Sequence, residues 1–182
     1  MNSTNSRLLG LLLAIIAVAV LSLLGASQGW AQEKHRFSYK SPPGKYLQRV
    51  AIDLGDVPGH QAAIYEVQYK FTSDAPVYDG VKVVEIFVRG TSDTIAGSGS
   101  SILYSTSVME NGDKIFTQSN MLLNATVNAD GSRQARMTTV GKITGGTGKF
   151  KGIRGSIRAA GTTDFKTGTS DQQNEVEYWF EN

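Results

Sequence analysis

Glu66 and Gln68 are the side chains in this chain best suited by type and spacing to acid-base chemistry. They alternate with apolar residues at Tyr65, Val67, Tyr69 and Phe71, and this period of two predicts a β-strand. If the apolar side chains face outward, against a partner subunit or another cover, Glu66 and Gln68 point into the interior. Burial there raises the pKa of a carboxylic acid and prepares it for proton transfer. If the apolar side chains fill the interior instead, both polar side chains are solvated.

With Glu66 in the interior, it is the candidate catalytic residue, and Gln68, Phe87 and Tyr104 are candidate ligand-binding residues. The sequence contains no cysteine and only His35 and His60. Thiol catalysis and Cys-ligated zinc are therefore excluded, and we predict neither a metal site nor a cofactor.

A second candidate is the glycine-dense stretch of residues 143–157, because such loops can bind phosphate through backbone amides. Its spacing fits neither a Walker loop nor a dinucleotide fingerprint, and strand-like alternation follows it. The glycines are therefore predicted to be structural, providing positive φ in a tight loop or room for close backbone approach. They are Gly145, Gly146, Gly148, Gly152 and Gly155.

Other polar residues give weaker signals. His60 is more typical of a loop residue than of a triad base, because the sequence lacks a nucleophile elbow. Several carboxylates near predicted strand ends lack the spacing of a calcium loop and are expected to serve turns and solubility. They are Asp53, Asp56, Asp74, Asp79 and Asp93.

The N-terminal segment predicts export. Arg7 precedes an almost wholly apolar run at residues 8–24, and the small residues Gly29 and Ala31 follow. This pattern is typical of a signal peptide cleaved after Ala31, which implies a secreted or periplasmic protein without a stable membrane span. An uncleaved anchor is the alternative.

The mature part, residues 32–182, is predicted to be one all-β domain. Strand-like runs cover residues 65–71, 83–88, 102–109, 114–127, 133–143, 153–165 and 174–180, with weaker candidates at 36–40 and 47–54. Asp79-Gly80, Asn111-Gly112 and Asp130-Gly131 predict hairpin turns, whereas residues 96–100 predict a flexible connection. We expect a single antiparallel eight-stranded β-barrel, with an open sandwich as the alternative.

The net charge is small, with 18 Lys plus Arg against 16 Asp plus Glu. Between Arg133 and Thr163, however, there are seven basic residues and no acidic one. Such a basic strip could bind an anionic polymer, unless an acidic strand bearing Glu175 and Glu177 pairs beside it. Its members are Arg133, Arg136, Lys142, Lys149, Lys151, Arg154 and Arg158.

Three segments together resemble the allene oxide cyclase barrel family, which is related in build to dirigent proteins. Residues 63–68 resemble its first barrel strand, residues 143–157 its Gly-rich turn, and residues 178–180 its closing strand. The resemblance implies a trimeric barrel in which Glu66 matches the family's catalytic glutamate. Gln68 stands where the family has asparagine, and the family's cysteine has no counterpart.

The sequence therefore favours a secreted barrel that holds a small apolar molecule in its cavity. The first alternative is a cofactor-free cyclase or isomerase that uses Glu66. The second is surface binding of an anionic polymer through the basic strip. A homo-oligomer is possible, and no nucleic-acid partner is expected.

Overall fold

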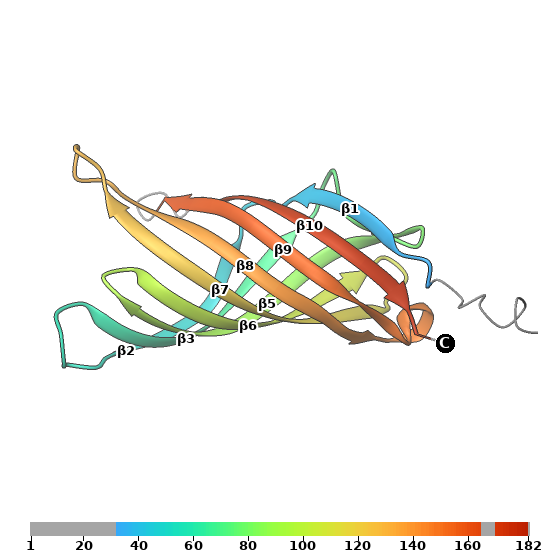
Figure 1. Cartoon of the computed structure of the whole chain (residues 1–182), viewed down its shortest axis with the longest axis horizontal. Coiled ribbons are helices and arrows are strands. Elements are labelled where there is room, and N and C mark those ends of the chain that lie inside the picture. The colour runs from blue at the N-terminus through green and yellow to red at the C-terminus, as the bar shows by residue number, and fades with distance from the viewer. Residues whose placement is uncertain (1–31, 165–169, 182) are drawn as a thin grey trace, which may run out of the picture. The chain divides into compact units, whose positions relative to one another are not determined.

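Antiparallel strands make up nearly all of the chain that the computed structural model describes, residues 32–164 and 170–181 (Figure 1). The strands are β1 (His35–Lys40), β2 (Lys45–Asp53), β3 (His60–Lys70), β4 (Val77–Tyr78), β5 (Val81–Ile95), β6 (Ser98–Met109), β7 (Lys114–Val127), β8 (Arg133–Gly146), β9 (Ile153–Asp164) and β10 (Ser170–Phe180). The only helical element in the described part is the short 3-10 turn η1 (Gly148–Phe150). The predicted all-β class is confirmed.

The ten strands form one sheet in the order β1-β10-β9-β8-β7-β6-β5-β3-β2, with β4 paired to β5. The expected eight-stranded closed barrel differs from this arrangement in two ways. The strand number is ten, and no ladder among the described residues joins the edge strands β1 and β2. Residues 41–44 between those strands include Pro42 and Pro43, which have no backbone N–H to donate to a closing ladder.

The sheet is nevertheless strongly curled. Residues 41–44 connect its two opposite edges, and a link of this length spans at most about 18 Å. The edges must therefore approach each other, so the sheet wraps around an interior (Figure 1). Bulges in the ladders near Tyr46, Val83 and Phe116 add local bending.

Tight turns set the register of the hairpins. Asp79 and Gly80 connect β4 to β5, and their φ values of 45° and 80° are both positive. Positive φ at both central residues is what an Asp-Gly hairpin turn requires. The turns containing Asn111-Gly112 and Asp130-Gly131 likewise connect β6 to β7 and β7 to β8. All three predicted turns are confirmed.

The Gly/Ser-rich residues 96–100, predicted to be a flexible connection, are mostly part of a turn and a strand. Ala96 and Gly97, with φ values of 49° and 87°, form a two-residue turn between β5 and β6. Ser98, Gly99 and Ser100 already belong to β6. The composition suggested a loop over all five residues, but only two residues are needed for a tight hairpin turn. The paired strands β5 and β6 continue up to those two residues.

An apolar cluster fills the interior near η1, where β5, β7 and β9 begin and β6, β8 and β10 end. Phe150 and Ile153 are fully buried there, and Met109, Ile115 and Val83 are 1% exposed. Burying an aliphatic or aromatic side chain of this size contributes about 1.5–3 kcal/mol. This cluster, called the apolar plug below, closes one end of the interior.

Residues Glu33–Asn182 form one compact unit. The predicted signal peptide, residues 1–31, lies outside the described residues. Within residues 32–164 and 170–181, no helix has the length and apolar character needed to cross a membrane.

Candidate functional site

The interior beyond the apolar plug contains a cavity of about 170 Å³. Each of the ten strands contributes at least one lining residue, so the whole curled sheet forms its wall. Among the described residues that line the cavity, none carries a charge. A charged ligand would therefore lose its hydration without gaining an ion-pair partner.

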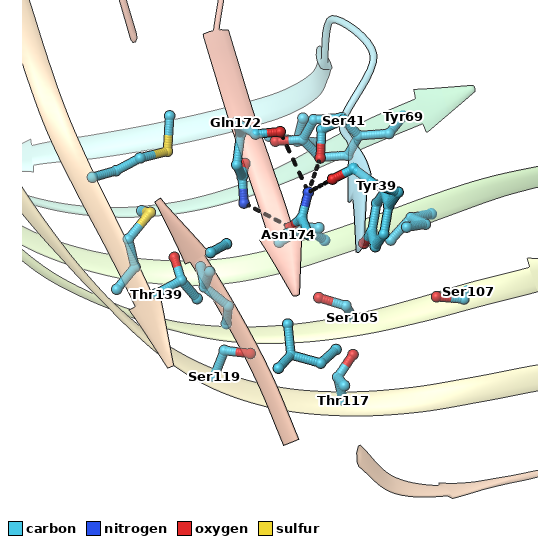
Figure 2. Close-up of a pocket in the computed structure, with 18 of the residues that line it drawn as sticks. Tyr39, Ser41, Tyr69, Ser105, Ser107, Thr117, Ser119, Thr139, Gln172 and Asn174 are labelled. Atoms are coloured by element: carbon cyan, nitrogen blue, oxygen red, sulfur yellow. Dashed lines mark hydrogen bonds between the residues drawn. The ribbon is translucent and has the colours of Figure 1, made fainter. Parts of the chain in front are cut away.

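Hydroxyl side chains form one side of the cavity wall. Ser105 of β6 lies opposite Thr117 of β7 in the ladder, and Ser119 and Thr139 continue the polar surface onto β7 and β8 (Figure 2). Ser107, Thr117, Ser119 and Thr139 are all buried. Each hydroxyl can donate one hydrogen bond and accept others. This wall can therefore bind a ligand oxygen that accepts a hydrogen bond, such as a carbonyl, or one that also donates, such as a hydroxyl.

Two amide side chains form a second polar group, on β10 near the end of β1 (Figure 2). Asn174 is 4% exposed, and its Nδ2 donates to Ser41 Oγ at 2.9 Å and to the Tyr39 carbonyl at 3.3 Å. Gln172 Nε2 donates to Asn174 Oδ1 at 3.2 Å. These bonds fix the orientation of the Asn174 amide in the cavity wall.

The two polar groups are linked by the ladder register. Thr139 of β8 lies opposite Ala159 of β9, which lies opposite Asn174 of β10, and Asn174 lies opposite Tyr39 of β1. The methyl group of Ala159 is the smallest side chain in this row and leaves space between Thr139 and Asn174. Along this row, the Thr139 hydroxyl and the Asn174 amide face the interior with open space above Ala159 between them.

Tyrosines occupy the remaining part of the wall. Burial raises the pKa of Tyr69 to about 12, and the pKa of Tyr39 is raised further by burial and by the neighbouring Tyr69. Burial also raises the pKa of Tyr78 well above its usual range. These phenols therefore stay protonated at neutral pH and serve as neutral hydrogen-bonding groups.

The four side chains predicted from the sequence lie together, but on the other face of the sheet. Tyr65, Val67 and Tyr69 line the cavity, whereas Glu66, Gln68, Phe87 and Tyr104 are absent from its lining. Glu66 Oε1 pairs with Arg89 at 2.6 Å, and Gln68 Nε2 donates to Glu85 at 2.8 Å. The Arg89 guanidinium lies 5.7 Å from the centroid of the Phe87 ring, and Tyr104 is 57% exposed.

This placement corresponds to the second of the two orientations that the alternation allowed, but the Glu66 side chain is only 14% exposed and is paired with Arg89 rather than solvated. A strand residue points to the opposite face from its neighbours, so filling the interior with Tyr65 and Val67 directs Glu66 outward. Glu66 is consequently held by an ion pair on the outer face, away from the cavity. The period of two could not by itself decide which face of the strand is inside.

The glycine-dense segment contributes no glycine to the cavity lining. Gly148 has φ 50°, and a methyl group there would collide with the Asp113 carboxylate, which accepts the backbone N–H of Lys149 at 3.0 Å. A methyl group on Gly155 would collide with the Glu177 carbonyl of the neighbouring strand. The structure places the other three glycines, Gly145, Gly146 and Gly152, in the same segment around η1.

Three residues of the basic strip have acidic neighbours. Lys149 Nζ pairs with Asp79 at 3.0 Å, and Arg154 pairs with Glu181 at 2.9 Å. Arg158 lies opposite Glu175 in the β9 and β10 ladder. The acidic strand β10 thus lies beside β9, as the alternative required, but Glu177 pairs with Lys34 and Arg36 rather than with a residue of the strip.

His60 lies between two carboxylates near the β5 and β6 turn. Its Nδ1 is 2.7 Å from Asp56, and its Nε2 is 2.8 Å from Asp93. Because carboxylates only accept, both contacts are hydrogen bonds when the ring is protonated. Hydrogen bonds to Asp93 and Asp56 raise the pKa of His60, and the bond to His60 is the main cause that lowers the pKa of Asp56.

This cluster predicts a pH-dependent stability. Because the pKa of His60 is raised in the folded protein, the protonated ring stabilises the fold fully at pH values below the ordinary His pKa of 6.5. This stabilisation is lost as the pH rises through the raised pKa. The lowered Asp56 pKa adds stability above its ordinary value of 3.8. The gap in melting temperature between the wild type and His60→Asn should therefore be larger at about pH 5.5 than at about pH 9. An equal gap at both pH values would contradict this assignment.

The sequence assigned His60 to a loop and its two carboxylates to turns and solubility. Asp56 and Asp93 are far apart in the chain, and the pairing of β3 with β5 brings them to the same histidine. In the described part of the chain, no group of three or more His, Cys, Asp or Glu side chains is arranged so that it could hold a metal ion.

Neither a protein-family model nor a curated protein matches this chain. Among solved structures, it is similar to the pterocarpan synthase dirigent protein PsPTS1, with 15% identity and a TM-score of 0.43, over 82% of this chain and 97% of that one. It is also similar to the pterocarpan synthase dirigent protein GePTS1, with 14% identity and a TM-score of 0.44, over 85% of this chain and 88% of that one. The narrower resemblance to allene oxide cyclases stays a prediction.

Proposed function

We propose that this protein binds a small, uncharged, ring-sized molecule that carries a hydroxyl or carbonyl oxygen. This proposal rests on a cavity of about 170 Å³ that is lined by no charged residue. Hydroxyl groups lie on one side of it, and the hydrogen-bonded Asn174 amide lies on the other. A cavity of about 150 Å³ is known to accept benzene, so a single ring matches the available space. The apolar ligand expected from the sequence becomes, in this proposal, an amphipathic one.

The hydrogen-bonding groups decide the ligand class. A purely apolar molecule would leave Thr117, Ser119 and Thr139 without a hydrogen-bond partner from the ligand, at a cost of about 1–3 kcal/mol for each unpaired group. An oxygen on the ligand can pair with these hydroxyls. The apolar side chains of Leu103 and Met121 contact the rest of the ring.

Benzyl alcohol, toluene and benzoate test this proposal because they share one ring and differ in polarity and charge. We expect benzyl alcohol to shift the NMR signals of the Asn174 side-chain amide saturably. Toluene and benzoate should bind at least about tenfold more weakly, because one leaves polar groups unpaired and the other brings an uncompensated charge. Equal binding of benzoate, or no binding of benzyl alcohol, would overturn the proposal.

Native mass spectrometry of the protein purified from its own host gives an independent test. A stoichiometric neutral molecule of about one ring would support the assignment and identify the natural ligand class. A bound carboxylate or phosphate ester would contradict it. The apolar N-terminal run followed by small residues supports the further proposal that the protein is secreted or periplasmic.

A further inference from the structure

The edge strand β2 is the most exposed element of the sheet. All nine of its residues are exposed, including Val50 and Ile52 at 62% and 64%. It pairs with β3 on one side, and no described strand pairs with its other side. A long exposed edge with apolar side chains is a template for pairing with another strand.

The direction of the free backbone groups follows from the β2 and β3 ladder. Leu54 donates its N–H to the His60 carbonyl at 3.0 Å, and residues 48–53 keep the same register with β3. Alternate residues bond to the same neighbour in an antiparallel ladder. Val50 and Ile52 therefore bond toward β3, and Arg49, Ala51 and Asp53 direct their N–H and C=O groups to the free edge.

The same segment is self-complementary in charge. If two copies pair antiparallel with Ala51 opposite Ala51, Arg49 of each copy lies opposite Asp53 of the other. Each of these opposed pairs exchanges two backbone hydrogen bonds, because its groups already point to the free edge. Centring the pair on Arg49 would instead oppose like charges, which is unfavourable in cross-strand pairs.

The outer face gains an apolar contact in this register. Val50 lies opposite Ile52 of the second copy, and Ile64 of β3, 61% exposed, lies beside Val50 in the ladder. Gln48 contacts Glu66 across the same ladder at 3.4 Å, which places these even-numbered side chains on the outer face. The side chains of Val50, Ile52 and Ile64 from both copies would then cover one another.

We infer that two copies of this chain associate through their β2 strands, antiparallel and centred on Ala51, to form one continuous sheet. Such an interface is isologous and closes as a two-fold dimer rather than the trimer implied by the family resemblance. The dimer does not depend on the ligand proposed for the cavity.

Charge exchange at the edge tests the inference. In Arg49→Asp alone, acidic residues oppose each other, and in Asp53→Arg alone, basic residues oppose each other. Each variant should be monomeric, with dimerisation weakened at least about tenfold. An equimolar mixture of the two restores opposite charges and should dimerise. Sedimentation velocity of the full-length protein over about a hundredfold range of concentration gives the readout.

Lys45→Asp is the matched control, because it makes a comparable charge change on β2 outside the paired segment and should leave the dimer intact. The melting temperature of each variant reports whether the fold survives, since Asp53 also accepts the Gly55 N–H at 3.0 Å. A monomeric wild type would overturn the inference. A dimer that persists in both single variants, or a mixture that stays monomeric, would overturn it as well.

Discussion

Replacing Ala159 with phenylalanine should abolish binding of a ring-sized ligand while the sheet stays folded. Ala159 is 6% exposed and lies between Thr139 and Asn174 in the ladder, where it leaves the central gap of the cavity. A phenyl group from the protein would occupy the space that the ligand ring needs. We expect a loss of affinity of about a hundredfold, or about 2.8 kcal/mol.

The effect can be measured by NMR titration with benzyl alcohol, followed at the Asn174 side-chain amide. A hundredfold loss would remove saturable binding of such a small probe from the measurable range. Ala160→Phe is the matched control, because Ala160 is the next residue on β9 and is exposed on the outer face. Unchanged binding by Ala159→Phe would show that the probe binds elsewhere.

The stability of Ala159→Phe also distinguishes a real cavity from a packed interior. A ring inserted into a filled core costs typically about 1–3 kcal/mol because neighbours must move. A ring inserted into the existing space should cost less than that. Urea unfolding of Ala159→Phe beside Ala160→Phe gives the comparison.

Truncating Phe150 to alanine should lower the free energy of unfolding more than any of the other substitutions proposed for this protein. Phe150 is fully buried at the apolar plug, and its ring lies 6.5 Å from the Tyr78 ring in an edge-on arrangement. Deletion of a buried phenyl group costs about 3–5 kcal/mol through lost transfer energy and the cavity left behind. That is a large part of the stability of a domain of this size.

Urea unfolding of Phe150→Ala measures this loss directly. Phe116→Ala is the control, because Phe116 is 37% exposed and its truncation should cost less than about 1 kcal/mol. An equal loss of unfolding free energy in the two variants would mean that the apolar plug stabilises the fold no more than a partly exposed side chain does.

Local features of the fold were predictable from the sequence. The strand-like runs at residues 102–109 and 114–127 lie within β6 and coincide with β7, because segments that lack a helical period and are bounded by turn dipeptides favour extended backbone. Asp79-Gly80 marked a real turn because positive φ at two successive residues is a local requirement. The two-residue strand β4 was missed, since so short a segment has no period to detect.

The candidate site was not predictable in the same way. On β6, the interior receives Ser105 and Ser107, whereas Ile102 and Tyr104 lie exposed outside. The common rule that apolar side chains face inward therefore gives the wrong face for this strand. Asn174, in a strand with several polar residues, had no feature that marked it as an interior group.

The sequence by itself determined the extended segments, most of the turns between them and the absence of cysteine chemistry, because these depend on residue types or on residues close together in the chain. The tertiary structure decided which face of each strand is inside and that the sheet curls without a closing ladder. It also decided that Asp56 and Asp93 meet at His60. These outcomes depend on pairing between distant strands, and a change of face moves every side chain of a strand at once without altering its period.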